Sequence, residues 1–213
     1  MPNWCSNYIE IEDSGDNLDA HELEKFMEIV TEEEDGRAYC LVNLSPMPEV
    51  LNGTRSPKPT GDFDPHGKFM ELVEDEGNTH WTPEHYEQEK AQHYMLIEKG
   101  DRAQAETGFD NWYDWANHPS NWGTKWGDCN TQLSFDPDYG IEGNFETAWG
   151  PLSAEFWEGV SKRFPTLKIA ISYSEEGMCF EGGMAFHNGE CLYDECTEMS
   201  AHMGQARMVL AQG

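Results

Sequence analysis

Aromatic rings and one cation are the side chains whose spacing in this chain could do chemistry. The segment Asn121-Trp122-Gly123-Thr124-Lys125-Trp126 sets two indoles around a glycine with a lysine beside them, and Trp149 lies further along the chain. Exposed tryptophan faces stack on bases or peptide groups and attract cations. Trp122, Lys125, Trp126 and Trp149 therefore form a candidate aromatic pocket. The same rings could instead cover a sheet edge, and exposure of Trp122 and Trp126 would favour the pocket.

Histidine, cysteine and carboxylate patterns indicate no reaction. The sequence has no G-x-S-x-G, H-E-x-x-H, P-loop or G-x-G-x-x-G motif, so we assign no catalytic residue. Cys191-x4-Cys196 lacks the spacing of a zinc knuckle, and the calcium-like start Asp62-Phe63-Asp64 lacks the closing glutamate of an EF-hand loop. We expect no metal and no cofactor, and we consider an enzyme the less favoured class.

The charge of the chain excludes more functions than its motifs do. The 213 residues include 41 acidic and 13 basic side chains, which gives a formal net charge of -28. Direct binding to nucleic acid or to an anionic membrane requires the opposite sign. We therefore expect a basic partner, a host protein that itself binds nucleic acid. No apolar stretch is long enough to span a membrane and the chain does not start like a signal peptide, so we expect the host cytosol.

Imitation of DNA would require the acids to gather on one face. A globule of this size exposes roughly 10,000 Å², so its net charge averages about one per 360 Å², whereas B-DNA carries about one per 100 Å². The acids do concentrate in two stretches of the first half of the chain. The predicted partner-binding residues are Asp16, Asp19, Glu22, Glu24, Glu28, Glu32, Glu33, Glu34, Asp35, Glu71, Glu74, Asp75 and Glu76. A run of acids is more often a solvated helix end than a binding site, and acid-rich surfaces also suit high salt.

Apolar periodicity predicts the elements that position these residues. Residues 4–12 alternate as a strand does, and Leu23, Phe26, Met27 and Val30 form one buried stripe of a helix. Further predicted elements of the first half are a short strand at 39–42, a loop at 45–60, a short helix near 69–73, a helix at 82–99 that buries Tyr86, Tyr94 and Ile97, and a helix from 109.

The second half of the chain is dominated by strand patterns. Its predicted elements are a hairpin of 131–135 with 144–149, a capped helix at 153–163, a second hairpin of 167–173 with 178–186, and a helix at 197–211. This order predicts an α+β fold with a mostly antiparallel, ferredoxin-like sheet and helices on one face. We expect a single domain, 1–213, in which 45–107 is a loop-rich and helical insertion.

Five motifs along the chain carry a resemblance to a known family. They are Met1-Pro2-Asn3-Trp4-Cys5-Ser6-Asn7, Asn121 to Trp126, Phe145-Glu146-Thr147-Ala148-Trp149-Gly150-Pro151, Phe164-Pro165 and Tyr173-Ser174-Glu175-Glu176-Gly177. In combination they resemble the YubB-type ferredoxin-like proteins of phages and conjugative plasmids. The resemblance implies a ferredoxin-like fold without iron or sulfur, encoded on a mobile element. It implies no biochemical activity for any residue.

Two classes of function follow from these observations. The first is a non-catalytic acidic interaction protein of a phage or plasmid, which acts as a DNA mimic on a host defence protein of the restriction or CRISPR type. Its acidic surface would speed association with a basic groove. The alternative is a small ligand-binding protein or enzyme that uses the Trp-lined pocket. A structural accessory that only assembles with itself is a more distant third.

Overall fold

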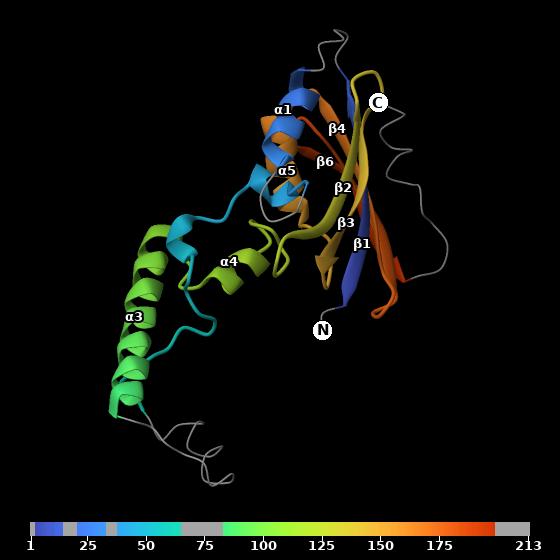
Figure 1. Cartoon of the computed structure of the whole chain (residues 1–213). Coiled ribbons are helices and arrows are strands. Elements are labelled where there is room, and N and C mark those ends of the chain that lie inside the picture. The colour runs from blue at the N-terminus through green and yellow to red at the C-terminus, as the bar shows by residue number, and fades with distance from the viewer. Residues whose placement is uncertain (1–2, 15–20, 33–37, 65–82, 199–213) are drawn as a thin grey trace. The chain divides into compact units, whose positions relative to one another are not determined.

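A computed structural model describes residues 3–14, 21–32, 38–64 and 83–198 of the chain. Its contacts divide the chain into two compact units, Met1–Pro46 with Ala116–Gly213, and Met47–Trp115. We call them the sheet unit and the helical unit, and each is described by itself (Figure 1). The segment predicted as an insertion, 45–107, overlaps the helical unit. No helix among the described residues is long and apolar enough to cross a bilayer.

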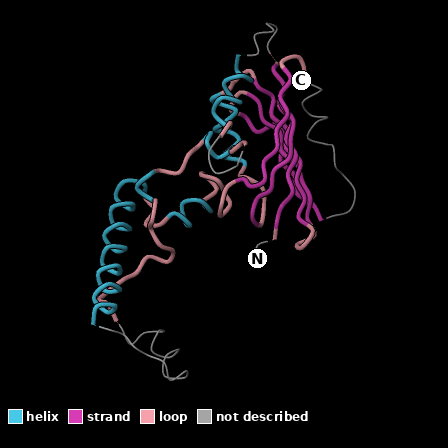
Figure 2. The backbone as a smooth tube through the Cα atoms, in the orientation of Figure 1, coloured by secondary structure: helices cyan, strands magenta, loops and turns pink. Residues whose placement is uncertain are grey.

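The sheet unit is built on six antiparallel strands. They are β1 (Trp4–Asp13), β2 (Asp128–Asp136), β3 (Gly140–Ala148), β4 (Leu167–Glu175), β5 (Phe180–His187) and β6 (Glu190–Glu198), in the spatial order β2-β3-β1-β4-β5-β6. The first strand of the chain therefore lies in the middle of the sheet, between β3 and β4. Figure 2 shows these strands as one twisted layer. The predicted α+β, ferredoxin-like fold is confirmed.

Two helices pack on one side of this sheet, α1 (His21–Val30) and α5 (Ala154–Arg163) (Figure 1). The predicted stripe of the first helix is buried at Leu23, Phe26 and Val30. Ser153 caps α5 because its hydroxyl oxygen accepts the backbone N–H of Phe156 at 3.1 Å. The rings of Phe26 and Phe164 meet edge to face, with centroids 5.7 Å apart. The helices, both predicted from sequence, close the hydrophobic core over one face of the sheet.

The predicted strand at 39–42 is wrong. Tyr39 makes only an isolated bridge to Thr31, and Leu41–Leu44 form a 3-10 helix. The cause is the buried carboxylate of Asp128, whose two oxygens accept the backbone N–H groups of Leu41 and Val42 at 2.9 Å each. These N–H groups are therefore not available for pairing with another strand. The sequence near residue 40 gives no sign that their acceptor is Asp128, 86 or 87 residues further along the chain.

The end of the described chain also differs from expectation. Residues 190–198 pair with β5 as the edge strand β6, which the sequence analysis missed. The predicted helix at 197–211 begins inside this strand, and its residues from 199 onward lie outside the described ranges. Exposure explains the miss, since nearly every β6 side chain is exposed and the strand shows no alternation.

The helical unit consists mainly of α3 (Pro83–Thr107) and the irregular segment 47–64, which includes a short 3-10 turn at Glu49–Leu51. The ammonium group of Lys58 lies 2.7 Å from Asp101 Oδ1 on α3, and Gly100 leaves the space that the stem of Lys58 occupies. Tyr94 is exposed, contrary to prediction, because the helix buries Leu96 and Ala103 instead. The short helix α4 (Trp112–Asn117) runs across the sequence boundary of the two units, and the helix predicted near 69–73 lies outside the described residues.

Candidate functional site

The face of the sheet opposite α1 and α5 carries the polar side chains of its strands. Along β1, Cys5, Asn7, Ile9 and Ile11 are buried, whereas the alternating residues from Trp4 to Glu12 are exposed or half-buried. Cross-strand register extends this face over β3 and β2. We call it the outer face and define it by Trp4, Ser6, Tyr8, Glu10, Glu12, Asn130, Gln132, Ser134, Asp136, Glu142, Asn144 and Glu146. Among the described residues, no helix covers it.

Carboxylates crowd one end of the outer face. Glu10 lies directly opposite Glu142 in the β1–β3 register. With Glu12, Asp136 and Tyr139, these residues line a hollow of about 420 Å³. The hydroxyl of Tyr8 donates to Glu142 Oε2 at 3.1 Å and fixes that carboxylate. On the other flank, Lys168 of β4 lies opposite Glu12 and offsets part of this charge.

Amide side chains occupy the middle of the outer face. A second hollow of about 300 Å³ is lined by Ser6, Asn7, Asn130, Gln132, Asn144, Phe145 and Glu146. Its wall includes a β-bulge in β2 between Cys129 and Gln132, where Asn130 has a φ of 52°. The bulge aims the Asn130 amide at Glu146 Oε2, which accepts a bond from it at 2.5 Å. A polar hollow therefore lies on the outer face next to the acidic one.

Two tryptophan rings lie beyond the polar hollow, where β1 begins. Trp4 and Trp126 are 40% and 39% exposed, and their ring centroids are 6.0 Å apart with the planes tilted by 37°. The Lys125 ammonium lies 4.5 Å from the centroid of Trp126. The structure thus places the Lys125 ammonium over the ring of its sequence neighbour Trp126. Trp4, which the pocket hypothesis did not include, lies beside them.

The other two tryptophans of the predicted pocket have different surroundings. Trp122 is buried and its Nε1 donates to the carbonyl of Ser45 at 2.9 Å, so its ring belongs to the core. Trp149 is 48% exposed, and its backbone has a φ of 74°, in the left-handed region that a bulky residue rarely adopts. The Trp149 N–H donates to the Asn3 carbonyl at 2.9 Å, which ties the end of β3 to the start of β1.

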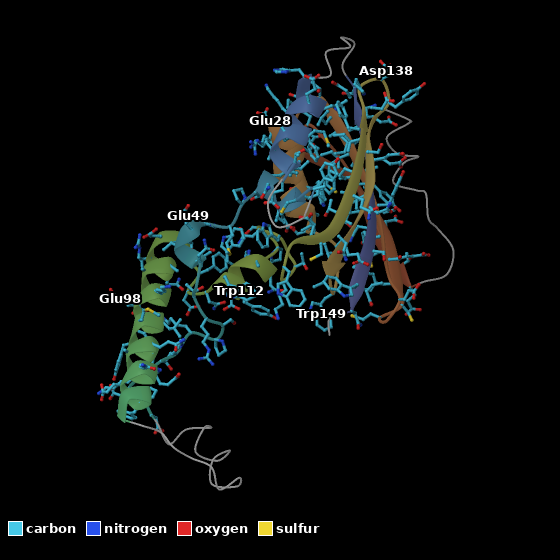
Figure 3. The ribbon with its side chains drawn as sticks, viewed as in Figure 1. Glu28, Glu49, Glu98, Trp112, Asp138 and Trp149 are labelled. Atoms are coloured by element: carbon cyan, nitrogen blue, oxygen red, sulfur yellow. The ribbon has the colours of Figure 1, made fainter. Side chains whose placement is uncertain are left out.

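Of the predicted partner-binding acids, the structure describes four, all on or just after α1. Glu24 and Glu28 are exposed, and Figure 3 labels Glu28 on the helix side of the sheet. Glu22 is half-buried and accepts the backbone N–H and the hydroxyl of Thr166 at 3.0 and 2.8 Å. Glu32 is half-buried and accepts from Asn43 at 3.3 Å. Glu22 and Glu32 therefore hold the fold together.

The remaining predicted acids lie outside the described residues. They are Asp16, Asp19, Glu33, Glu34, Asp35, Glu71, Glu74, Asp75 and Glu76. Sequence reasoning instead missed the acids of the outer face. A partial signal for them exists, because Glu10 and Glu12 recur at even spacing inside the predicted strand 4–12 and Glu146 lies in the predicted strand 144–149, whereas Glu142 falls just before it. Such spacing places acids on one face, although only the register shows that the two sets adjoin.

The described cysteines and acids offer little for metal or nucleophilic chemistry. In the described ranges, no group of three or more His, Cys, Asp or Glu side chains is arranged to hold a metal ion. Burial raises the pKa of the Cys5 thiol to about 12, so that it stays protonated at neutral pH. The carboxylate of Glu175, also buried, accepts the backbone N–H groups of Gly177 and Met178 and thereby closes the β4–β5 turn.

Comparison with known proteins bears on the fold. Residues 121–209 match a family model described as a ferredoxin-like domain in Api92-like protein. The crystal structure of a protein Api92 from Yersinia pseudotuberculosis is 15% identical, with 96% of this chain and 100% of that chain covered and a TM-score of 0.44. No curated protein matches the chain. The family match leaves out β1, although β1 lies at the centre of the sheet. From Asn121 onward, the chain therefore carries a ferredoxin-like domain similar to the one in Api92-like protein.

Proposed function

We propose that the chain is a non-catalytic interaction protein whose acidic outer face binds a basic surface of a nucleic-acid-binding protein. The observation that carries this proposal is the pair Glu10 and Glu142, which face each other across neighbouring strands. Like charges at opposed positions destabilise a sheet. Keeping such a pair although it costs stability is typical of a functional surface. A cationic partner would remove the repulsion.

The local charge density of this face supports the proposal. Glu10, Glu12, Asp136, Glu142 and Glu146 lie on three adjacent strands. Four successive outward-facing positions on each of these three strands cover roughly 400 Å² of the sheet surface. The five acids therefore average about one per 80 Å². B-DNA carries about one phosphate per 100 Å². This part of the outer face therefore reaches the charge density of a duplex, although the average over the whole chain falls well short of it.

The finer features of the proposal come from the sequence. The resemblance to phage and plasmid proteins favours a host defence protein as the target and the host cytosol as the place. Binding to its nucleic-acid groove would exclude DNA by direct competition. Electrostatic steering would make association fast at low salt and slower as salt screens the attraction.

Two variants of equal formal charge test which surface binds. The first replaces Glu10, Glu142 and Glu146 of the outer face with glutamine. The matched control replaces Glu24, Glu28 and Glu155, which are exposed on the helices of the same unit. Each immobilised protein is presented with bacterial host lysate at low salt. Nucleic-acid-binding proteins that it retains are then purified and tested for displacement of DNA.

We expect the wild-type chain to retain such a protein at low salt, to release it as the Debye length falls below about 8 Å, and to compete with DNA for it. Neutralising the outer face should weaken binding at least about tenfold, since three close charge contacts are lost. The helix-side control should change affinity by less than about twofold. Equal losses in both variants, or no competition with DNA, would contradict the proposal.

A further inference from the structure

The exposed tryptophans at the end of the outer face are not explained by packing or by charge. Trp4 and Trp126 each leave about two fifths of their surface exposed, and Ser6, two residues after Trp4 on the same face, lines the polar hollow. Exposed tryptophan is enriched at the centres of protein interfaces, where one rigid ring supplies a large contact area. These two rings are therefore the candidate anchor of the interaction surface proposed above, on which this inference rests.

The surroundings of Trp126 indicate what such rings accept. The Lys125 ammonium already lies 4.5 Å from its centroid, within the distance at which an aromatic face attracts a cation. Trp4 lies on the outer face with Ser6 as its next neighbour along the strand. Through the register, Trp4 opposes Ala148 and Ser6 opposes Glu146, so Glu146 is the diagonal neighbour of Trp4. Diagonal positions are about 7–8 Å apart, within reach of long side chains.

The polar hollow beyond Trp4 is lined by side chains that can accept hydrogen bonds. Glu146 offers a carboxylate held in place by Asn130, and Gln132 and Asn144 offer amide oxygens. A guanidinium group is flat, stacks on aromatic rings and donates five N–H bonds without accepting any. An ammonium group lacks the flat face and has fewer donors. The indole ring, the Glu146 carboxylate and the neighbouring amide groups together are therefore more complementary to an arginine side chain than to a lysine side chain.

We propose that Trp4 and Glu146, beside Trp126, bind an arginine side chain of the basic partner. The guanidinium stacks against the exposed Trp4 indole, since the Lys125 ammonium already lies over the Trp126 ring, and donates to the Glu146 carboxylate and to the neighbouring amide oxygens. Charge decides against two other occupants. A nucleic acid would bring phosphates toward five carboxylates, and a second copy of this chain would bring a second acidic face.

Two synthetic peptides of equal length and charge test the inference. In one peptide all the cationic residues are arginine, and in the other they are all lysine. Their affinities for the full chain are measured at low salt by fluorescence anisotropy. The variant is Trp4→Leu, which keeps an apolar side chain but removes the π face. The matched control is Tyr94→Ala, an aromatic of similar exposure in the helical unit. Circular dichroism establishes that each variant folds, and Glu146→Gln serves as a second variant if Trp4→Leu does not.

We expect the wild-type chain to favour the arginine peptide, and Trp4→Leu to cut this preference by about five- to tenfold while affinity for the lysine peptide stays the same. Tyr94→Ala should preserve the preference, and Glu146→Gln should weaken arginine binding more than lysine binding. If both peptides bind but Trp4→Leu leaves their ratio unchanged, the arginine site is overturned and the acidic interaction surface stands. If neither peptide binds, the proposed function itself fails.

Other occupants give distinct outcomes. A single-stranded oligonucleotide that binds the wild-type chain, but not Trp4→Leu, would assign the rings to base stacking and overturn the inference. Light scattering that shows a dimer lost in Trp4→Leu would identify a second copy as the occupant and would also overturn it.

Discussion

At the scale of single residues, the sequence motifs that resemble a known family turn out to hold the sheet together. The amide of Asn7 is buried and donates to the carbonyl of Cys5 and to the hydroxyl of Thr147, both at 2.9 Å. The hydroxyl of Thr124 donates to the carbonyl of Ala148 at 2.8 Å. Buried polar groups need such partners, and their loss is costly. These residue types could be singled out from sequence, but the partners Thr147 and Ala148 lie more than twenty residues away from Asn7 and Thr124 and could not be predicted.

One acidic residue of β6 gives a testable pH dependence. Partial burial, and secondarily the nearby carboxylate of Glu155, raise the pKa of Asp194. A raised carboxyl pKa means that the folded state holds this proton more tightly than the unfolded state does. The resulting stabilisation is present in acid and is lost as pH rises through the folded pKa, so ionised Asp194 destabilises the fold at neutral pH.

Asp194→Asn should therefore raise the melting temperature at pH 7 and leave it nearly unchanged near pH 3.5. Because the side chain is mostly exposed, the gain is a few tenths of a kcal/mol at most, about 1 °C. Glu190→Gln, at the start of the same strand, serves as the control and should show no comparable gain. Thermal unfolding followed by circular dichroism at the two pH values measures both variants. A loss of stability at pH 7 in Asp194→Asn would contradict the assignment.

At the scale of elements, apolar periodicity and capping residues were sufficient to predict a helix or strand wherever one of its faces is buried. Strands β1 to β5 and helix α5 follow alternation, apolar stripes and the Ser153 cap, and all were predicted. The 3-10 helix at 41–44 was not, because the distant Asp128 decides it. Strand β6 was missed because exposure on both faces leaves no periodic signal. Local physics therefore predicts the buried elements, and long-range pairing decides the others.

The pairing of β5 with β6 depends on the absence of a side chain at Gly182. A Cβ there would lie 2.4 Å from the Glu195 carbonyl oxygen and 2.4 Å from the Tyr173 ring, so a backbone group would have to move. Gly182→Ala should lower the free energy of unfolding by about 1–3 kcal/mol. The measurement is urea unfolding monitored by circular dichroism.

Gly159 in α5 is the matched control for this substitution. An added Cβ meets nothing within 4 Å there, and the position is helical. Gly159→Ala should raise the free energy of unfolding by about 0.5–1 kcal/mol, because alanine favours the helix over glycine. If the two substitutions change stability in the same direction, the close approach at Gly182 does not constrain the sheet.

At the scale of the whole molecule, composition determines the amount of charge, and folding determines where that charge is concentrated. The net charge of -28 predicts a basic partner, and the acid runs drew attention to α1 and its flanks. In the described structure, two of the four α1 acids serve the fold, and the densest group lies on the outer face. Strand register brings Glu10 and Glu142 together from opposite halves of the chain. Composition alone could not have predicted that these two residues pair across neighbouring strands.

Carboxyl footprinting tests the central claim most directly. A water-soluble carbodiimide labels exposed Asp and Glu side chains, and mass spectrometry reads each site with and without the arginine peptide bound at low salt. We predict that binding protects Glu10, Glu142 and Glu146 of the outer face and leaves Glu24 and Glu28 of α1 as reactive as before. Protection of Glu24 and Glu28 with no change on the outer face would contradict the account.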